Sequence, residues 1–228
     1  MSAHTPTAPA AGLYAQKDDG YFRAARLDLL GMLPAGGGLR LLEVGAAGGA
    51  TLHAAKALGL ATYTVGIDLA RDVAVSDDGF GADLFLRGDI ETLELDLPPD
   101  SFDAVLCADV LEHLFDPWRA VKRLAHHLRP GGLFLSSIPN IRNHRALRAV
   151  VCEGDFRYES AGLLDRSHLR FFCRKNVHEL FEQAGLAIEA IEENMGAYGL
   201  RHKALDHATF RLFHDFFVFQ FLTRARKP

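Results

Sequence analysis

Short apolar runs alternate with helical patterns along most of this 228-residue chain, and this alternation limits the fold more than any other feature. Short apolar runs bounded by turn residues are typical of buried strands. Repeated strand–helix units imply a parallel sheet with helices on both faces, which is an α/β fold. The expected strands cover residues 39–45, 63–67, 83–87, 102–107, 133–138 and 186–191, and the main helical patterns cover residues 110–128 and 175–184.

Acidic residues stand at or just after the ends of four of these expected strands. They are Glu43, Asp68, Asp89 and Asp109. In open α/β sheets, ligands bind outside the carboxyl ends of the strands. The sequence therefore predicts a binding site at this edge of the sheet.

The loop after the first expected strand is rich in glycine, which lets a backbone turn tightly and approach a ligand closely. It reads Glu43-Val44-Gly45-Ala46-Ala47-Gly48-Gly49. Its spacing differs from the GxGxxG loop that binds dinucleotide phosphates, and the acid before the first glycine would repel a pyrophosphate. An NAD-dependent enzyme is therefore disfavoured, and the acid suits a cationic ligand.

Four motifs resemble, in order, those of the class I S-adenosylmethionine-dependent methyltransferases. The family's glycine loop is matched by LLEVGAAGG, its second acidic motif by VGIDLA, its third and fourth motifs by GDIETLELDLPPDSFDAVLCADVLEHL, and the stretch around its fifth strand by LRPGGLFLSSIPN. The match covers roughly residues 21–192, and its clear departure is Ala47, where the family has the middle glycine of the loop. The resemblance implies a Rossmann-like, largely parallel seven-stranded sheet, S-adenosyl-L-methionine as cofactor, and methyl transfer as the reaction.

The resemblance also implies which residues hold the cofactor: Glu43, Gly45, Gly49, Asp68, Leu69, Asp89, Ile90 and Asp109. The two glycines pass under the methionine part, while Glu43 holds the loop or faces the amino-acid end. Asp68 accepts hydrogen bonds from the ribose hydroxyls, as acids do at this place in nucleotide folds. The adenine is contacted by Leu69, Asp89 and Ile90.

An acid-x-x-Glu-His motif after the fourth expected strand contains the candidate catalytic residues. Asp109, which the resemblance places near the methionine amine and methyl group, would share one face with Glu112 and His113 if a helix begins there. His168, much later in the chain, could close over them. The full set is similar to that of metal-dependent methyltransferases of small-RNA termini, which bind Mg or Mn, and the motif alone is similar to ubiquinone-pathway O-methyltransferases. The four residues are expected to bind a metal, to supply a base for a hydroxyl acceptor, or to have a structural role.

Residues 141–172 interrupt the strand–helix pattern and are expected to form a lid over the acceptor site. The stretch 163–172 is similar to one in bacterial methyltransferases found with surface-polysaccharide and glycosylation enzymes. O-methylation of a sugar, a glycan precursor or a related small metabolite is therefore the first hypothesis. The 2′-O-methylation of RNA ends and a non-catalytic module that only binds the cofactor are the alternatives. Polar residues in and beside the lid suit a hydroxylated or anionic acceptor: Asn140, Asn143, His144, Arg166 and His168.

Composition limits the partners of the chain and its organisation. The net charge of −4 disfavours nucleic acid as a partner. The three cysteines contain no CxxC motif, which argues against a disulfide framework and favours the cytoplasm. No apolar run approaches about 18 residues, so no membrane span is expected. We expect a disordered tail at residues 1–12, a single domain at 13–228, and a Phe-rich segment at 210–222 that packs in the core or forms a homodimer interface.

Overall fold

The computed structural model describes residues 25–69, 81–196, 206 and 213–228 of the chain. The tail expected at residues 1–12 lies outside these residues, as does Phe210 at the start of the Phe-rich segment.

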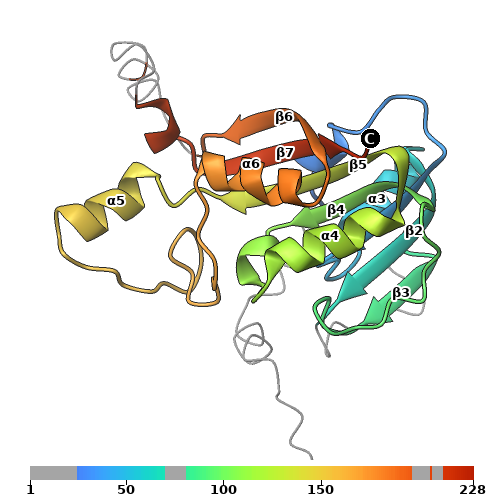
Figure 1. The fold of residues 1–228 in the computed structure, drawn as a ribbon, viewed down its shortest axis with the longest axis horizontal. Coiled ribbons are helices and arrows are strands. Elements are labelled where there is room, and N and C mark those ends of the chain that lie inside the picture. Colours follow the sequence, from blue (N-terminus) through green and yellow to red (C-terminus); the bar gives the residue numbers. More distant parts are fainter. Residues whose placement is uncertain (1–24, 70–80, 197–205, 207–212) are drawn as a thin grey trace, which may run out of the picture.

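Within the described residues, seven strands form one sheet with helices on both faces (Figure 1). The strand order is β3-β2-β1-β4-β5-β7-β6. The strands are β1 (Leu39–Val44), β2 (Ala61–Asp68), β3 (Leu84–Arg87), β4 (Phe102–Ala108), β5 (Leu128–Pro139), β6 (Ala187–Asn194) and β7 (Gln220–Arg226). The helices are α2 (Leu27–Leu30), α3 (Ala50–Ala57), α4 (Pro117–His127), α5 (His144–Val151) and α6 (Arg174–Gln183), with 3₁₀ turns η3 (Leu111–His113) and η4 (His214–Phe216).

The direction of the last strand differs from the expected largely parallel sheet. Strands β1 to β5 pair in parallel, which confirms the α/β arrangement. Strand β7 runs antiparallel to both β5 and β6, so the sheet is mixed. An antiparallel return needs no crossover helix, and β7 follows β6 and enters the sheet between β6 and β5. The Phe-rich pattern hid this strand, because the strand begins only at Gln220 and contains the polar residues Thr223, Arg224 and Arg226 without a regular alternation.

Strand β5 begins at Leu128, five residues before the expected start at residue 133, and so includes the sequence Arg129-Pro130-Gly131-Gly132, which is typical of a turn. Phe102 pairs with Leu128 and Ala104 pairs with Leu133, so the four intervening residues of β5 oppose a single residue of β4. The turn-forming residues therefore make a bulge inside the strand, where Gly131 has φ +75°.

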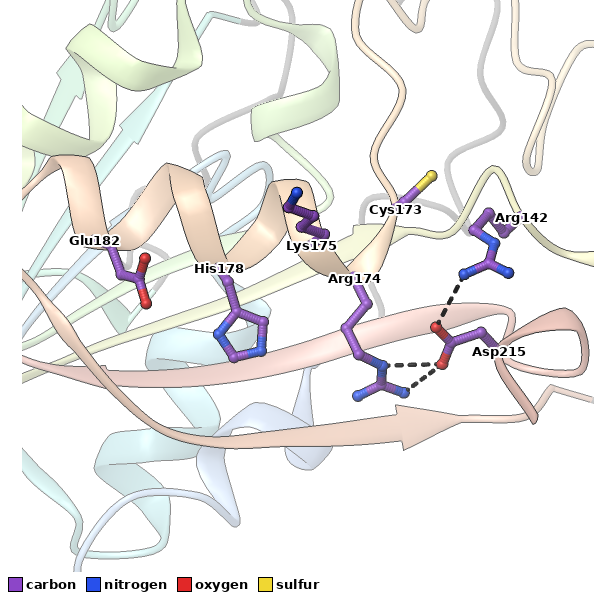
Figure 2. Close-up of a pocket in the computed structure, with 7 residues that line it drawn as sticks. All are labelled: Arg142, Cys173, Arg174, Lys175, His178, Glu182 and Asp215. Atoms are coloured by element: carbon purple, nitrogen blue, oxygen red, sulfur yellow. Dashed lines mark hydrogen bonds and ion pairs between the residues drawn. The ribbon is translucent and has the colours of Figure 1, made fainter. Parts of the chain in front are cut away.

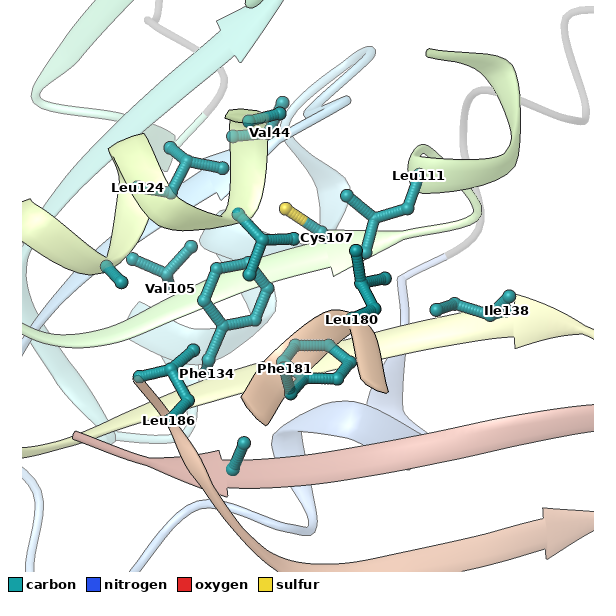
Figure 3. Close-up of a cluster of buried hydrophobic side chains, with 14 of the residues drawn as sticks. Val44, Val105, Cys107, Leu111, Leu124, Phe134, Ile138, Leu180, Phe181 and Leu186 are labelled. Atoms are coloured by element: carbon teal, nitrogen blue, oxygen red, sulfur yellow. The ribbon is translucent and has the colours of Figure 1, made fainter. Parts of the chain in front are cut away.

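Two apolar layers cover the two faces of the sheet. The side chains of successive residues in a strand point to opposite faces, so Val105 joins the layer under α4 and α6 while Leu106 joins the layer under α2 and α3. Figure 3 shows the first layer, in which the ring centroids of Phe134 and Phe181 lie 5.4 Å apart. This packing holds the carboxyl ends of the strands in fixed positions at one edge.

The helix expected at residues 110–128 is interrupted near its start. The 3₁₀ turn η3 ends at His113, and α4 begins only at Pro117, whose fixed φ and missing N–H suit the first turn of a helix. Asp116 precedes it as the N-cap, and its side chain accepts a hydrogen bond from the Arg119 N–H at 3.0 Å. The interruption gives the residues before Pro117 a tighter geometry than an α-helix would.

Residues 141–172, which are expected to cover the acceptor site and are called the lid below, contain α5 and a long irregular loop. Figure 1 shows α5 and this loop extending beyond the end of the sheet. The loop returns to the body of the protein at an isolated bridge between Asn140 and Phe172. Among the described helices, none combines the length and apolar character that a bilayer span requires.

The aromatic residues of the Phe-rich segment divide between core and surface. Phe217 and Phe221 are buried within the chain, whereas Phe213 is about half exposed. Packing in the chain's own core therefore accounts for the buried rings, and the homodimer stays a prediction.

Candidate functional site

The glycine loop after β1 is held in a conformation that only small residues fit. Gly45 has φ +74°, and a Cβ placed there would lie 2.4 Å from Cγ2 of Val110. The N–H groups of Gly45 and Ala46 both donate to the carbonyl oxygen of Ile67 at the end of β2. Gly49 has φ +71° and is the N-cap of α3. The loop therefore passes directly over the turn that follows β4.

Replacing Gly45 with alanine is expected to lower the free energy of unfolding by about 2–5 kcal/mol. A left-handed alanine costs roughly 1–2 kcal/mol, and overpacking against Val110 costs about 1–3 kcal/mol more. Urea unfolding of the variant measures the sum. Gly59→Ala is the matched control, because Gly59 has φ +69° and a Cβ there would meet no described atom within 4 Å. The double variant Gly45→Ala, Val110→Ala should be less destabilised than the two single losses added together. Equal losses of unfolding free energy in Gly45→Ala and Gly59→Ala would contradict a steric clash between a Cβ at residue 45 and Val110.

Asp68 ends β2 and lies at the expected cofactor edge. Its Oδ2 accepts a hydrogen bond from the Ala47 N–H at 2.6 Å. Ala47 itself has φ +46°, so alanine adopts the left-handed turn where the family has glycine. A carboxylate can accept about four hydrogen bonds, so Asp68 can hold the loop and a ribose hydroxyl together. Leu69 follows directly and is half-buried.

Asp89 and Ile90 lie in the turn after β3. Oδ1 of Asp89 accepts a hydrogen bond from the Glu91 N–H at 2.9 Å. Ile90 is buried and packs in the main core layer. Its contact with the adenine, which the resemblance implies, stays a prediction. The carboxylate of Glu91 accepts hydrogen bonds from the N–H groups of Phe115 and Asp116 at 2.9 and 2.7 Å. This turn is thereby tied to the turn after β4.

Glu43 is a buried acid in the middle of the sheet. Only 3% of its surface is exposed. Burial raises the pKa of Glu43 from 4.5 to about 8, against a hydrogen bond from Thr51 that lowers it. The hydroxyl of Thr51 also accepts the Arg26 N–H at 3.2 Å. Glu43 therefore braces α3 and the N-terminal segment against β1, which agrees with the loop-holding alternative of the sequence interpretation.

Asp109 follows β4 and forms an ion pair that the sequence did not indicate. Its Oδ2 lies 2.5 Å from Nη1 of Arg26, and the same guanidinium nitrogen donates to the Ser137 hydroxyl at 2.9 Å. The Gln220 amide donates to the other oxygen of Asp109. Asp109 has φ +53°, and burial raises its pKa against the opposing charge of Arg26. Arg26 lies one residue before α2, in a stretch whose only sequence signal was helical spacing, so nothing in the motifs pointed to it.

The remaining catalytic candidates gather in a buried cluster, Glu112, His113 and His168. Each residue offers a metal-ligating atom, and these atoms lie within 4.8 Å of one another. The imidazole centroids of the two histidines are 4.7 Å apart. Asp109 is not part of this cluster, because η3 turns Glu112 and His113 toward the lid while Asp109 faces Arg26. The expectation that the first acid shares a face with the other two is therefore wrong.

Most of the polar residues expected to face the acceptor instead hold the C-terminal segment. The side-chain amide of Asn140 donates to the carbonyl oxygens of Asp215 and Val218, and that of Asn143 donates to Val218 as well. Nδ1 of His144 lies 3.1 Å from the carbonyl oxygen of Phe216. Arg166, by contrast, is exposed on the lid.

An open pocket of about 390 Å³ lies beside the first turn of α6. Figure 2 shows that Asp215 pairs with both Arg142 and Arg174 in this pocket. None of its lining residues belongs to the glycine loop or to the turn after β4. The pocket is therefore separate from the carboxyl edge of the sheet and from the buried cluster.

Comparisons with known proteins give the same assignment as the motifs. A family model described as a methyltransferase domain matches residues 14–191. The ubiquinone biosynthesis O-methyltransferase of Xanthomonas campestris pv. campestris is 35% identical over 134 residues, which is 56% of this chain and 55% of that one. The 27-O-demethylrifamycin SV methyltransferase of Amycolatopsis mediterranei is 34% identical over 110 residues, covering 46% of this chain and 40% of that one. The chain thus spans about half the length of the curated relatives it matches.

The fold is also shared with solved structures. The S-adenosylmethionine-dependent methyltransferase of Mesorhizobium loti superimposes with a TM-score of 0.61 at 24% identity, over 88% of this chain and 96% of that one.

Proposed function

Since the chain belongs to the methyltransferase-domain family, we propose that it uses S-adenosylmethionine to methylate a hydroxyl oxygen of a small hydroxylated acceptor, such as a sugar, a glycan precursor or a related metabolite. The observation that carries this proposal is the buried cluster of Glu112, His113 and His168. An alcohol must lose its proton during methyl transfer, so O-methylation needs a base or a metal ion near the acceptor.

The residues at the strand edge fit the cofactor by their chemistry. Arg26 and Asp109 form an ion pair whose charges complement those of an amino-acid zwitterion. Arg26 can hold the carboxylate of the methionine part, and Asp109 can hold its ammonium group. Gly45 leaves no room for a side chain, which is the geometry expected where a backbone approaches a ligand closely. When bound, S-adenosylmethionine supplies an electrophilic methyl group on a positively charged sulfur.

The chain's own residues then have the task of orientation. In-line displacement needs the acceptor oxygen, the methyl carbon and the sulfur in a line, and holding reactants in that geometry accounts for much of the rate. Hydrogen bonds from the loop to Asp68 and from Arg26 to Ser137 fix the strand edge. The turn after β4 continues from Asp109 into Glu112 and His113, so the same segment connects the cofactor edge with the buried cluster.

In each histidine of the cluster, the hydrogen bond at Nδ1 identifies the ring nitrogen that can accept a proton. Nδ1 of His113 lies 3.0 Å from the Ser167 carbonyl oxygen, and Nδ1 of His168 lies 3.2 Å from that of Leu163. A carbonyl oxygen can only accept a hydrogen bond, so each Nδ1 carries the proton. The basic lone pair is therefore on Nε2, where it can receive a proton from an acceptor hydroxyl.

The names of the relatives support O-methylation, and the lid supports the proposed class of acceptor. Both curated relatives described above are named as methyltransferases, one of them explicitly an O-methyltransferase. Arg166 is exposed on the lid and suits a hydroxylated or anionic acceptor. The net charge of −4 argues against RNA as the acceptor.

Incubation of the protein with methyl-labelled S-adenosylmethionine and a panel of acceptors tests the proposal. The panel contains free sugars, nucleotide-linked sugars, small phenols and a short RNA. We expect S-adenosylhomocysteine and labelled product with a hydroxylated small molecule. Labelling of the RNA alone would favour the RNA-end alternative. Binding of S-adenosylmethionine by calorimetry, with no turnover on any acceptor, would favour the non-catalytic module.

A further inference from the structure

The cluster of Glu112, His113 and His168 joins two parts of the chain that are far apart in sequence. Glu112 and His113 belong to η3, and His168 belongs to the lid. The three residues are 1%, 6% and 8% exposed. Two imidazoles and a carboxylate are rarely gathered in a protein interior unless they share hydrogen bonds, a proton or a metal ion.

Each histidine is oriented as a metal ligand would be. Metal-binding histidines almost always donate their second ring N–H to a carbonyl or a carboxylate, which fixes the tautomer and the ring plane. Here both Nδ1 atoms donate to lid carbonyl oxygens, those of Ser167 and Leu163. In this tautomer Nε2 of each ring has the lone pair that a metal ligand needs.

The backbone around the cluster is fixed before any ligand arrives. The carbonyl oxygen of Glu112 accepts hydrogen bonds from the N–H groups of Leu169 and Arg170 at 2.8 and 2.9 Å. On the lid, Oδ1 of Asp165 accepts both the N–H and the hydroxyl of Ser167 at 2.8 and 2.6 Å. Sites whose ligands are held by such supporting bonds lose little order on binding.

We propose that Glu112, His113 and His168 bind one divalent transition-metal ion, with zinc as the ion that fits best. Two nitrogens and one carboxylate oxygen are a donor set that zinc takes, whereas magnesium and calcium take oxygen ligands. Ligand atoms within 4.8 Å of one another can close around an ion with bonds of about 2.0–2.2 Å. Three protein ligands leave a fourth position open, as in catalytic zinc sites.

The ion gives the cluster a role in the proposed reaction, and this part of the inference rests on the proposed function. An alcohol oxygen in the fourth position would become more acidic, because the positive ion would stabilise the alkoxide, and its proton would pass to water. The histidines are then ligands, and the ion takes over the activation of the hydroxyl. Since two of the supporting carbonyls and one ligand belong to the lid, the ion also fixes the lid to η3.

Titration of the metal-free, full-length protein with Zn²⁺ in a calorimeter, without acceptor, tests the site. We expect saturation at one ion per chain. His113→Asn and His168→Asn should each weaken binding by more than about 100-fold, since loss of a residue that merely orients a ligand already costs about 10- to 100-fold. Asparagine keeps an N–H near the position of Nδ1, so the supporting hydrogen bonds can persist. His127→Asn is the matched control, because His127 is buried and its Nδ1 also lies near a carbonyl oxygen, that of Pro98.

A second measurement needs no variant. Co²⁺ bound to the wild-type protein should show the visible absorption of a four-coordinate ion, and Zn²⁺ should abolish it. No saturable binding by the wild-type protein, or the same affinity in both histidine variants as in the wild type, would overturn the site. Methyl transfer at full rate after chelation would overturn the catalytic role of the ion but not the methyltransferase function. Saturable Zn²⁺ binding without turnover on any acceptor would leave the site standing and overturn the proposed function.

Discussion

Replacing His168 with asparagine is expected to lower kcat by about 10²- to 10⁴-fold, the usual contribution of a positioned acid–base group, while the affinity for S-adenosylmethionine stays unchanged. The asparagine N–H can still donate to the Leu163 carbonyl oxygen, 3.2 Å from Nδ1 in the wild type. What the variant loses is Nε2. The loss of turnover is expected whether Nε2 takes the proton itself or binds the ion that makes the acceptor hydroxyl more acidic. Single-turnover kinetics with saturating cofactor measure the change.

Glutamine at the same position separates the effect of losing Nε2 from the effect of losing the hydrogen bond to the lid. Its amide group reaches the place of Nε2 and cannot keep the bond that Nδ1 makes, so His168→Gln removes the lid contact and the basic nitrogen together. We expect both variants to be slow, with His168→Gln also lower in melting temperature. His127→Asn should leave kcat at the wild-type value, since His127 lies at the end of α4, outside the cluster. Full activity in His168→Asn with reduced stability would show that His168 is only structural.

The parts of the fold that were predictable from sequence are those set by local pattern. A short apolar run between turn residues can hardly be anything but a buried strand, and β1 to β4 lie where such runs predict them. The last third of the sheet was harder. Strand β7 has Gln220, Thr223 and Arg224 among its residues, and it is a strand because β5 and β6 pair with it on both sides. No local pattern in the sequence contains that information.

The site shows the same division between local and distant information. Acids at strand ends could be found from their spacing, and Asp68 and Asp109 do lie at the carboxyl edge. Arg26 could not be found, because its role depends on an ion pair with a residue 83 positions away. The grouping of Asp109 with Glu112 failed for a local reason, since Asp109 lies before the 3₁₀ turn and has φ +53°, which is outside right-handed helical geometry. His168 was found only because a resemblance pointed to a distant histidine.

Glu43→Gln is expected to make the protein more stable than the wild type at neutral pH, by about 3 kcal/mol at pH 7. Burial raises the pKa of Glu43 from 4.5 to about 8 in the folded protein. In the unfolded chain the carboxyl group ionises at its ordinary pKa, so between these two values unfolding releases a proton. Stability must then fall as pH rises through this window, by about 1.4 kcal/mol for each pH unit. Glutamine has no proton to release and can still accept the hydrogen bond from Thr51.

The difference in free energy of unfolding between the wild type and Glu43→Gln reports the titration of Glu43 alone, because every other titrating residue is common to both proteins. Urea unfolding at a series of pH values should give equal stabilities near pH 4, with the wild type falling progressively behind as pH rises toward 8. Above that value the gap should stop growing, since Glu43 is then ionised in both states. A gap that is constant with pH would mean that Glu43 ionises normally in the folded protein. The charge of Arg26 lowers the pKa of Glu43 against the larger effect of burial, so an ionised Glu43 would draw on the guanidinium that pairs with Asp109. A protonated Glu43 leaves that charge to Asp109, so the high pKa of Glu43 and the ion pair of Arg26 with Asp109 favour each other.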